Sequence, residues 1–416
     1  MVRPFRGRQN NEMEAPAAAT PNDRGPEEHE VIVVGAGSAG IATAAALQAR
    51  GFETVVFEAS GSVASRWRSR YEELHLNSWR LMSNLPGYRM PRRYGRYPSR
   101  DDFVAYLEEY VEQQQLVIRC NTSMVRINRA DGLWQVQTTT NPALARYVVI
   151  ATGWDAVPVL PDWSGRGEFG PELIHSSEFQ SARHYRGREV LVVGAGNSGI
   201  DIAGHLIAAG ARVTVSMRTP PNLARRDVLG LPGQPLLVMI ADHLPKHFAD
   251  FSFSLVQRLV FGDLTTFGLP RPTEGAYVNF DRRLVNPAID DGFVEALKAG
   301  RTRIVGEVQR LSGSDVILVD GECIRPDAVI CATGYRRGLE AFVGHLGVLR
   351  PDGVPFAYWG APEHAAARQL YFAGMWGQFS GEIRLGPAHA RRIAHAAVRH
   401  RAHLQSRRQR EGVPER

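Results

Sequence analysis

The chain has 416 residues, of which 44% are hydrophobic and 22% are charged, a composition typical of a globular protein with two or three domains. Its net charge of +6 comes almost entirely from arginines. These are spread along the chain rather than gathered in one stripe, so no nucleic-acid partner is expected. No apolar run approaches the roughly 20 residues that cross a bilayer, so we expect no transmembrane segment and a cytoplasmic protein.

Neither the two ends of the chain nor the cysteines indicate a functional site. Residues 1–29 are rich in Pro, Ala, Asn and charge and lack the apolar core of a signal peptide, which predicts a disordered tail. Residues 401–416 are rich in arginine and predict a basic, flexible tail. None of Cys120, Cys323 and Cys331 forms a CxxC pair, so neither a redox dithiol nor a metal site is indicated.

From His29 the sequence HEVIVVGAGSAGIATAAALQARGFETVVFEAS predicts one supersecondary unit. The short apolar run 31–34 is typical of a buried parallel strand. A glycine turn follows, then an Ala-rich helix over 41–49, and then a second strand over 54–57 that ends in Glu58. Strand, glycine turn, helix, strand and acid is the order that a dinucleotide site needs. The turn contains Gly35, Gly37, Ser38 and Gly40.

The same unit returns as REVLVVGAGNSGIDIAGHLIAAGARVTVSMRT, with strands over 190–193 and 213–217. Its turn contains Gly194, Gly196, Asn197, Ser198 and Gly199. In both turns the first glycine permits the tight turn, the second lets the backbone approach a pyrophosphate, and the third lets helix and strand pack closely. Two complete units indicate a duplicated domain.

The remaining elements suggest how the chain is divided. A helix over 101–115 and strands over 116–120, 134–139 and 147–150 complete a first domain. Residues 220–291 form an irregular stretch rich in Pro, Phe and Leu, and strands return at 316–319 and 328–331. We therefore predict an α/β protein with two Rossmann-like, three-layer ββα domains, the first built from both ends of the chain. The predicted bounds are 30–155 and 326–400 for the FAD-binding domain and 156–325 for the NADPH-binding domain, whose segment 220–291 would form the substrate pocket.

The residue at the end of the second strand of each unit indicates which cofactor that unit prefers. Glu58 can accept hydrogen bonds from ribose hydroxyls, as expected for an adenosine without a 2′-phosphate. The second unit has Ser216 and Arg218 there and no carboxylate, and Arg218 would pair with a 2′-phosphate. The first site is therefore expected to bind FAD and the second NADPH. The strings ATGWDAVP and ATGYRRGL, the latter with Gly334, resemble the points where the chain crosses between dinucleotide domains.

Through these motifs, together with SRWRSRYEELHLN and LYFAG, the chain resembles the flavin-containing monooxygenases, a family of class B flavin-dependent monooxygenases. Within that family it is most similar to the YUCCA-type branch. The family fingerprint is represented by Phe169, His175 and Phe179, with Pro171 in place of a glycine. Phe179 followed by Gln180, rather than a Trp, favours this branch over the Baeyer–Villiger enzymes. Within the fingerprint, His175 is expected to be a structural residue of the domain linker.

The resemblance implies a mechanism in which NADPH reduces FAD, oxygen adds at the flavin C4a position, and the resulting (hydro)peroxyflavin oxygenates a small organic substrate. Asn77 matches a family residue beside the reacting flavin edge and is the candidate catalytic residue. The other matched residues are candidates for cofactor binding: Arg66 and Trp67 cover FAD, Arg226 lies near the nicotinamide nucleotide, and Gly374 and Met375 form the last turn over the flavin, ahead of a helix near Leu385.

The reaction itself stays open between heteroatom oxygenation and oxidative decarboxylation of a 2-oxo acid. A Baeyer–Villiger oxygenase shares every cofactor residue. An NADPH-dependent flavoprotein reductase is disfavoured by the missing cysteine pair, and a scaffold role by the intact cofactor motifs. The apolar segment 236–261 is expected to be a pocket lid or plain core, with a membrane-leaning surface less favoured. A homodimer is an open option.

Overall fold

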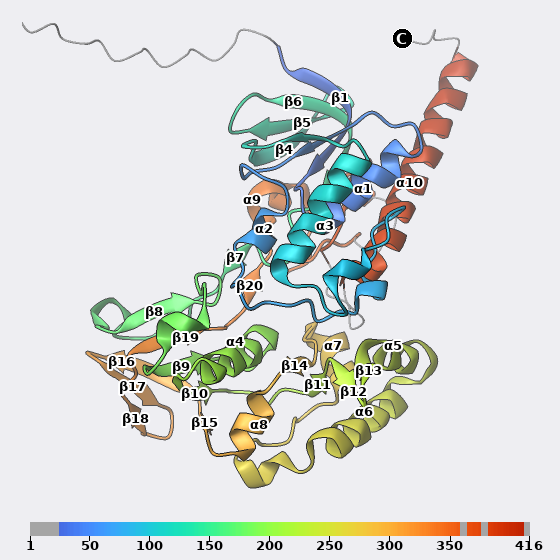
Figure 1. Cartoon of the computed structure of the whole chain (residues 1–416). Coiled ribbons are helices and arrows are strands. Elements are labelled where there is room, and N and C mark those ends of the chain that lie inside the picture. The colour runs from blue at the N-terminus through green and yellow to red at the C-terminus, as the bar shows by residue number, and fades with distance from the viewer. Residues whose placement is uncertain (1–24, 358–363, 376–381, 412–416) are drawn as a thin grey trace, which may run out of the picture.

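The computed structural model describes residues 25–357, 364–375 and 382–411. Two α/β domains lie one above the other and are joined by two extended linkers, in which β7 (Val157–Pro158) pairs with β20 (Tyr335–Arg336) (Figure 1). The first domain contains β1 (Glu27–Val34), α1 (Ser38–Gln48), β2 (Thr54–Phe57), α2 (Ser65–Arg68), α3 (Arg100–Gln113), β3 (Val117–Arg119), β4 (Met124–Ala130), β5 (Leu133–Thr138), β6 (Ala143–Ile150), α9 (Glu340–Val343), β21 (Leu370–Phe372) and α10 (Glu382–Glu411).

The first domain has the predicted three layers. Strands β3, β2, β1, β6 and β21 form a parallel sheet, and β4 and β5 continue from β6 as an antiparallel meander. Alternate side chains of β1 point to opposite faces of the sheet. Val31 and Val33 pack toward α1, α3 and α10, while Ile32 and Val34 pack toward the meander. A strand buried on both faces explains the unbroken apolar run in the sequence.

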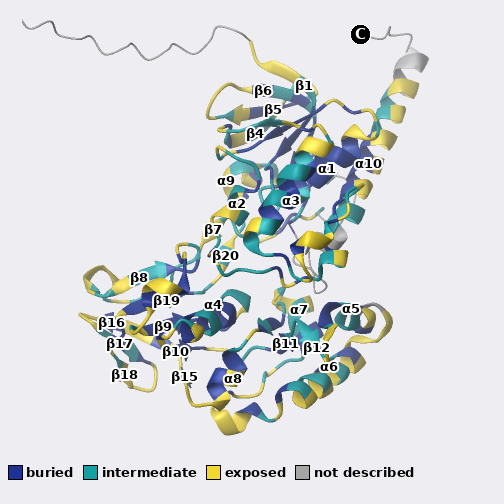
Figure 2. Cartoon of the chain, viewed as in Figure 1, coloured by how far each residue is buried: buried dark blue, intermediate teal, exposed yellow. Residues whose placement is uncertain are grey.

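The second domain repeats this arrangement. Its elements are β8 (Glu172–His175), β9 (Glu189–Val193), α4 (Asn197–Ala208), β10 (Arg212–Ser216), α8 (Phe293–Lys298), β15 (Thr302–Val305), β16 (Val308–Ser312), β17 (Asp315–Leu318), β18 (Cys323–Ile324) and β19 (Ala328–Cys331). The sheet order is β15-β10-β9-β19-β8, all parallel, with α4 and α8 on one face and the β16-β17-β18 meander on the other. Figure 2 shows buried residues along both sheets and on the inner faces of the helices.

The glycine turns have the same geometry in both domains. Gly35 has φ +108, and a Cβ on it would lie 2.5 Å from the Ala151 carbonyl oxygen. A Cβ on Gly40 would lie 1.9 Å from the carbonyl oxygen of Gly35, so helix and strand meet without room for a side chain. In the second turn the corresponding distances, from Gly194 to Ala332 and from Gly199 to Gly194, are 2.4 and 1.9 Å. The two ATG strings therefore support the glycine turns.

Three predicted boundaries are wrong. Residues 27–29, expected in the disordered tail, belong to β1 and pair with β6. Strand β19, placed by prediction in the returning part of the first domain, pairs with β9 and β8 in the second sheet, so the chain crosses back only after Cys331. Residues 401–411 continue α10 instead of forming a flexible tail. Arg401 anchors that helix, with Nη2 at 2.9 Å from Glu30 and its guanidinium over the Phe52 ring. Residues 412–416, and residues 1–24 of the predicted tail, lie outside the described residues.

Residues 220–291 are mostly helical and not irregular as predicted. They contain β11 (Leu223–Arg225), β12 (Asp227–Val228), β13 (Leu231–Pro232), α5 (Gly233–His243), α6 (Lys246–Phe261), α7 (Ala276–Arg283) and β14 (Ala288–Asp290). Helix α6 buries Ala249, Phe253 and Phe261, so part of this segment is core. The opposite side of α6 is exposed and apolar as well, with Phe248, Phe251, Leu255 and Leu259 exposed by 48–77%. Within the described residues, no helix combines the length and hydropathy of a bilayer-spanning segment.

We predict that Gly40→Ala destabilises the fold by about 3 kcal/mol or more, because the new Cβ overlaps a backbone oxygen that cannot move without the sheet. The measurement is the midpoint of thermal or urea unfolding. Gly37→Ala is the matched control, since a Cβ there meets no atom within 4 Å and φ is −80. Equal midpoints for the two variants would contradict this account of the turn.

Candidate functional site

A first cavity of about 480 Å³ opens at the carboxyl ends of the first domain's parallel strands. Ligand sites of α/β sheets lie at this edge. A Cβ on Gly37 would meet no atom within 4 Å, so the backbone of the turn faces open space. Residues predicted to bind a cofactor that line this cavity are Gly35, Gly37, Ser38, Glu58, Arg66, Trp67 and Gly374.

The carboxylate of Glu58 is held at the mouth of this turn. Glu58 is 7% exposed. One carboxylate oxygen accepts a hydrogen bond from the Ala36 N–H at 2.8 Å. The other accepts from the Ser60 N–H at 3.0 Å and from the Ser65 hydroxyl at 3.2 Å. A carboxylate has about four acceptor positions, so at least one remains for a ligand hydroxyl. The predicted acid therefore lies in the predicted place, oriented by backbone donors.

Residues 64–67 and 374–375 flank the cavity. Trp67 packs edge-to-face on Phe103 with the ring centroids 4.7 Å apart, and Arg66 donates to the Ala156 carbonyl at 2.8 Å. Gly374 has φ +67 and would place a Cβ 2.6 Å from that of Ala39. The side chain of Met375, predicted to bind cofactor, is instead fully buried in the core on the meander side of the sheet.

The second turn carries different side chains, and not all of them face a ligand. Asn197 and Ser198 line a second cavity, between the domains. Ser216 is 1% exposed and donates its hydroxyl to the Gly306 carbonyl at 2.7 Å, so it is not oriented toward a nucleotide as predicted. Arg218 is 79% exposed and lies 3.6 Å from Glu307, a loose pair that leaves the guanidinium accessible at the strand end. A Cβ on Gly196 would again meet open space.

The linkers meet around His175, which is a buried structural residue as predicted. Its Nδ1 accepts from the Ser177 N–H at 3.1 Å, and its Nε2 lies 3.1 Å from the Gly334 carbonyl oxygen, so the proton belongs on Nε2. Burial lowers the pKa of His175. Gly334 thus contributes a linker hydrogen bond and lines neither cavity, in contrast to its predicted role in cofactor binding.

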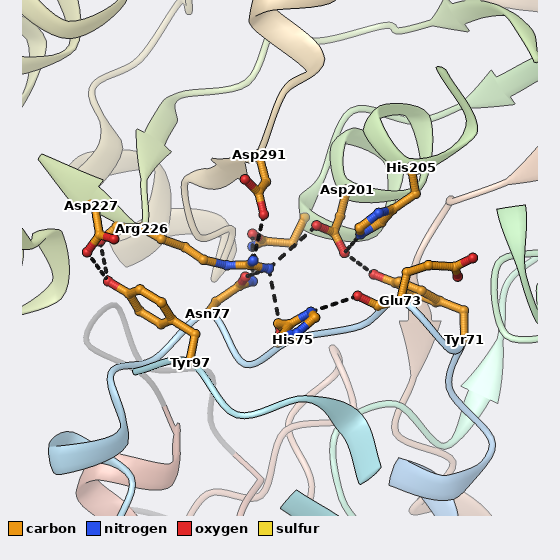
Figure 3. A network of polar contacts seen from close by, with 11 residues as sticks. Tyr71, Glu73, His75, Asn77, Tyr97, Asp201, His205, Arg226, Asp227 and Asp291 are labelled. Carbon is orange, nitrogen blue, oxygen red and sulfur yellow. Dashed lines mark hydrogen bonds and ion pairs between the residues drawn. The ribbon is translucent and has the colours of Figure 1, made fainter. Parts of the chain in front are cut away.

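The interdomain cavity has a volume of about 310 Å³ and is adjacent to the first, since Trp67, Arg70 and Asp155 line both. Figure 3 shows the polar network on its wall. Arg226 of the second domain lies at the centre, with Nη1 2.7 Å from Asp291 and Nη2 3.6 Å from Asp201. The same Nη2 reaches the first domain, at 3.3 Å from Asn77 Oδ1.

Arg226 therefore lies beside the predicted catalytic residue, but its charge is already matched by two carboxylates. A guanidinium shared in this way is a poor ligand for a further phosphate, because the phosphate would have to compete with Asp201 and Asp291 for its N–H groups. The predicted role near the nicotinamide nucleotide stays a prediction, and the two ion pairs argue against Arg226 as an anion ligand.

Sequence analysis missed a buried group of Tyr71, Asp201 and His205 on the same wall. The Tyr71 hydroxyl donates to Asp201, and His205 Nε2 lies 3.7 Å from the same carboxylate, an ion-pair distance. Burial alone would raise the pKa of Asp201, but the contacts with His205 and Tyr71 outweigh it and hold that pKa below 3.8. Burial alone would lower the pKa of His205, but Asp201 raises it above 6.5.

A second missed group joins the linkers. Arg70 forms an ion pair with Asp155 of the first linker and donates to the Tyr335 hydroxyl of the second at 2.9 Å. Tyr335 directly follows one ATG string and Asp155 is the second residue after the other, which was the available signal. In the part of the chain that the structure describes, no group of three or more His, Cys, Asp or Glu side chains could hold a metal ion.

We predict that His205→Gln destabilises the chain more at about pH 6 than at about pH 9. A raised histidine pKa stabilises the folded state fully below the ordinary value of 6.5, and this contribution is lost as the pH rises through the folded-state value. The measurement is the difference in thermal midpoint between parent and variant at each pH. The exposed His243→Gln serves as control, and a difference for His205→Gln that grows with pH would contradict the assignment.

Comparisons with known proteins agree with this geometry. Residues 32–229 match the family model described as pyridine nucleotide-disulphide oxidoreductase. The probable indole-3-pyruvate monooxygenase YUCCA3 of Arabidopsis thaliana is 30% identical over 336 residues, covering 78% of this chain and 77% of the relative. Indole-3-pyruvate monooxygenase YUCCA1 of Oryza sativa subsp. japonica is 34% identical over 322 residues, covering 76% and 79%.

Solved structures share the fold. The flavin-containing monooxygenase from Stenotrophomonas maltophilia superimposes with a TM-score of 0.66 at 22% identity, covering 89% of this chain and 99% of that one. OTEMO in complex with FAD and NADP gives 0.66 at 16% identity, covering 92% and 86%. The bacillithiol disulfide reductase from Bacillus cereus gives 0.66 at 21% identity, covering 90% and 100%. A flavin monooxygenase and a disulfide reductase thus share this fold.

Proposed function

The chain belongs to the flavin-dependent monooxygenases, in the branch of the YUCCA-type enzymes, and we propose that it binds FAD in the first domain and NADPH in the second and transfers one atom of O2 to a small organic substrate. In the balanced reaction NADPH supplies two electrons, one oxygen atom enters the substrate, and the other leaves as water. The bound flavin would supply the electron transfer and the activation of oxygen. The protein supplies binding, orientation and exclusion of water.

The observation that carries this proposal is the pair of equivalent turns with opposite charges at their strand ends. Both turns leave the backbone open at the second glycine, and both start a helix whose free N–H groups favour a pyrophosphate. The first has the oriented carboxylate of Glu58, which suits a bare ribose and repels a phosphorylated one. The second has the accessible guanidinium of Arg218, which suits a 2′-phosphate.

The arrangement of the cavities supports a reaction between the two cofactors. The interdomain cavity touches the second turn at Asn197 and Ser198 and adjoins the first cavity at Trp67. A nicotinamide ring and a flavin ring bound to the two turns would therefore meet at this wall, beside Asn77. Helix α5 closes the cavity with Gln234 and Leu237, which agrees with the interpretation of this part of the segment as a lid.

The charges of the interdomain cavity also bear on the substrate. Three arginines line it: Arg70, Arg225 and Arg226. In the described part of the wall, each is within 4 Å of at least one carboxylate of the protein itself. A substrate carboxylate would have to compete with those internal acids. We infer that a neutral or cationic soft nucleophile, such as an amine or a thioether, suits this site better than a 2-oxo acid.

We predict that the purified protein is yellow, oxidises NADPH in preference to NADH, and loses much of that preference in Arg218→Gln. The loss should be several-fold and reside in the KM for NADPH, because an exposed charge pair contributes about 1 kcal/mol. Arg303→Gln, on the neighbouring strand β15 and paired with Glu322, is the matched control. Protein that stays colourless with added FAD would overturn the proposed function as a whole.

We further predict incorporation of one labelled atom when amines and thioethers are incubated with the enzyme, NADPH and 18O2. Mass spectrometry of the products from a panel that also holds 2-oxo acids and ketones is the measurement. Preferential turnover of a 2-oxo acid would contradict the inferred substrate class. Ester products from ketones would instead identify a Baeyer–Villiger enzyme.

A further inference from the structure

The side-chain amide of Asn77 lies between two polar groups of the opposite domain. On one side Arg226 Nη2 donates to Asn77 Oδ1 at 3.3 Å. On the other, Asn77 Nδ2 donates to Asn197 Oδ1 at 3.3 Å. Asn77 is otherwise exposed to the interdomain cavity, which it lines together with both partners. The amide oxygen of Asn77 therefore faces Arg226, and its nitrogen faces Asn197.

The hydrogen-bond chemistry permits one orientation of this amide. A guanidinium only donates, so the atom facing Arg226 is the amide oxygen. The atom of Asn197 that faces Asn77 also accepts the Ile289 N–H at 2.9 Å, so it is an oxygen, and the Asn197 Nδ2 correspondingly donates to the Pro287 carbonyl at 3.2 Å. Flipping the Asn77 amide would place N–H against N–H on one side and oxygen against oxygen on the other.

Arg226 is itself fixed in place. It is 11% exposed at the side chain, pairs with Asp201 and Asp291, and reaches the His75 carbonyl at 3.4 Å. Its guanidinium also lies over the Tyr97 ring, 6.0 Å from the centroid (Figure 3). Because these partners come from both domains, the position of the guanidinium depends on how the two domains are placed relative to each other.

We propose that Arg226 is a positioning residue that fixes the amide of Asn77, so that the Nδ2 hydrogen not donated to Asn197, and not the carbonyl oxygen, is available to the cofactors in the interdomain cavity. The inference rests on the proposed function. A fixed N–H at this wall can donate to an acceptor atom of the reacting flavin edge or of the nicotinamide. A rotating amide would present its oxygen for part of the time and repel the same atom. The expected consequence of losing Arg226 is that reduced oxygen escapes as hydrogen peroxide.

The test is a double-mutant cycle of Arg226→Gln and Asn77→Ala, measured as the rate of H2O2 release per flavin at saturating NADPH without substrate. Loss of one pre-organised donor should raise this rate by about tenfold in either single variant. If Arg226 acts through Asn77, the double variant releases H2O2 no faster than Asn77→Ala alone. Arg226→Lys, which keeps the positive charge together with donors only, should recover part of the effect.

A further measurement and a control variant distinguish a positioning role of Arg226 from other roles. A nucleotide-binding role would change the ratio of KM values for NADPH and NADH, which positioning leaves unaltered. A purely structural role at the domain interface would be reproduced by Arg96→Gln, because Arg96 pairs with Asp227 across the same interface without touching Asn77. Additive effects in the cycle, or an Arg226→Gln variant that releases no extra H2O2, would overturn the inference. Failure of the parent protein to oxidise NADPH would overturn the proposed function instead.

Discussion

The contact on which both domains depend is the close approach of the third glycine of each turn to the carbonyl of the first. At Gly40 and Gly199 a Cβ would lie 1.9 Å from that oxygen, well inside any permitted separation. The contact sets the start of α1 and α4 directly above the ends of β1 and β9. Their free N–H groups consequently point to the sheet edge, where a pyrophosphate would be held. The ATG strings complete this contact from the neighbouring strands, through Ala151 and Ala332.

A second level of organisation joins the two domains. Arg70 ties the two linkers to each other through Asp155 and Tyr335, and Arg226 ties the second domain to Asn77 and His75 of the first. Both guanidinium groups are largely shielded from water and are paired with carboxylates, as such groups must be to avoid the cost of burying an isolated charge. The consequence for chemistry is a wall with fixed dipoles and little unmatched charge between the two glycine turns.

The glycine patterns, the apolar runs and the acid at position 58 were sufficient to predict the two Rossmann-like domains, the interrupted first domain and the edge of its sheet at which the cavity lies. These are local features: a glycine at positive φ or a strand buried on both faces constrains its own neighbourhood, whatever the rest of the chain does. The hairpin at Asp131 and Gly132, both at positive φ, follows from the same kind of local constraint, whereas the buried linker histidine His175 was predicted through the family resemblance. The two helices α5 and α6 were missed because their prolines and dense aromatics obscure a helical period.

The tertiary structure alone decided which polar side chains meet. Asn77 is separated from Arg226 by 149 positions and from Asn197 by 120. No periodicity relates such pairs, since their contact depends on how one domain is rotated against the other. Ser216, Gly334 and Met375 occupy motif positions, yet their orientation follows from the strand and linker on which they lie. The sequence thus determined where dinucleotides could be held, because turn geometry is local. The directions of the hydrogen bonds between the two sites were decided by the packing of the domains, because each bond needs a partner from the other one.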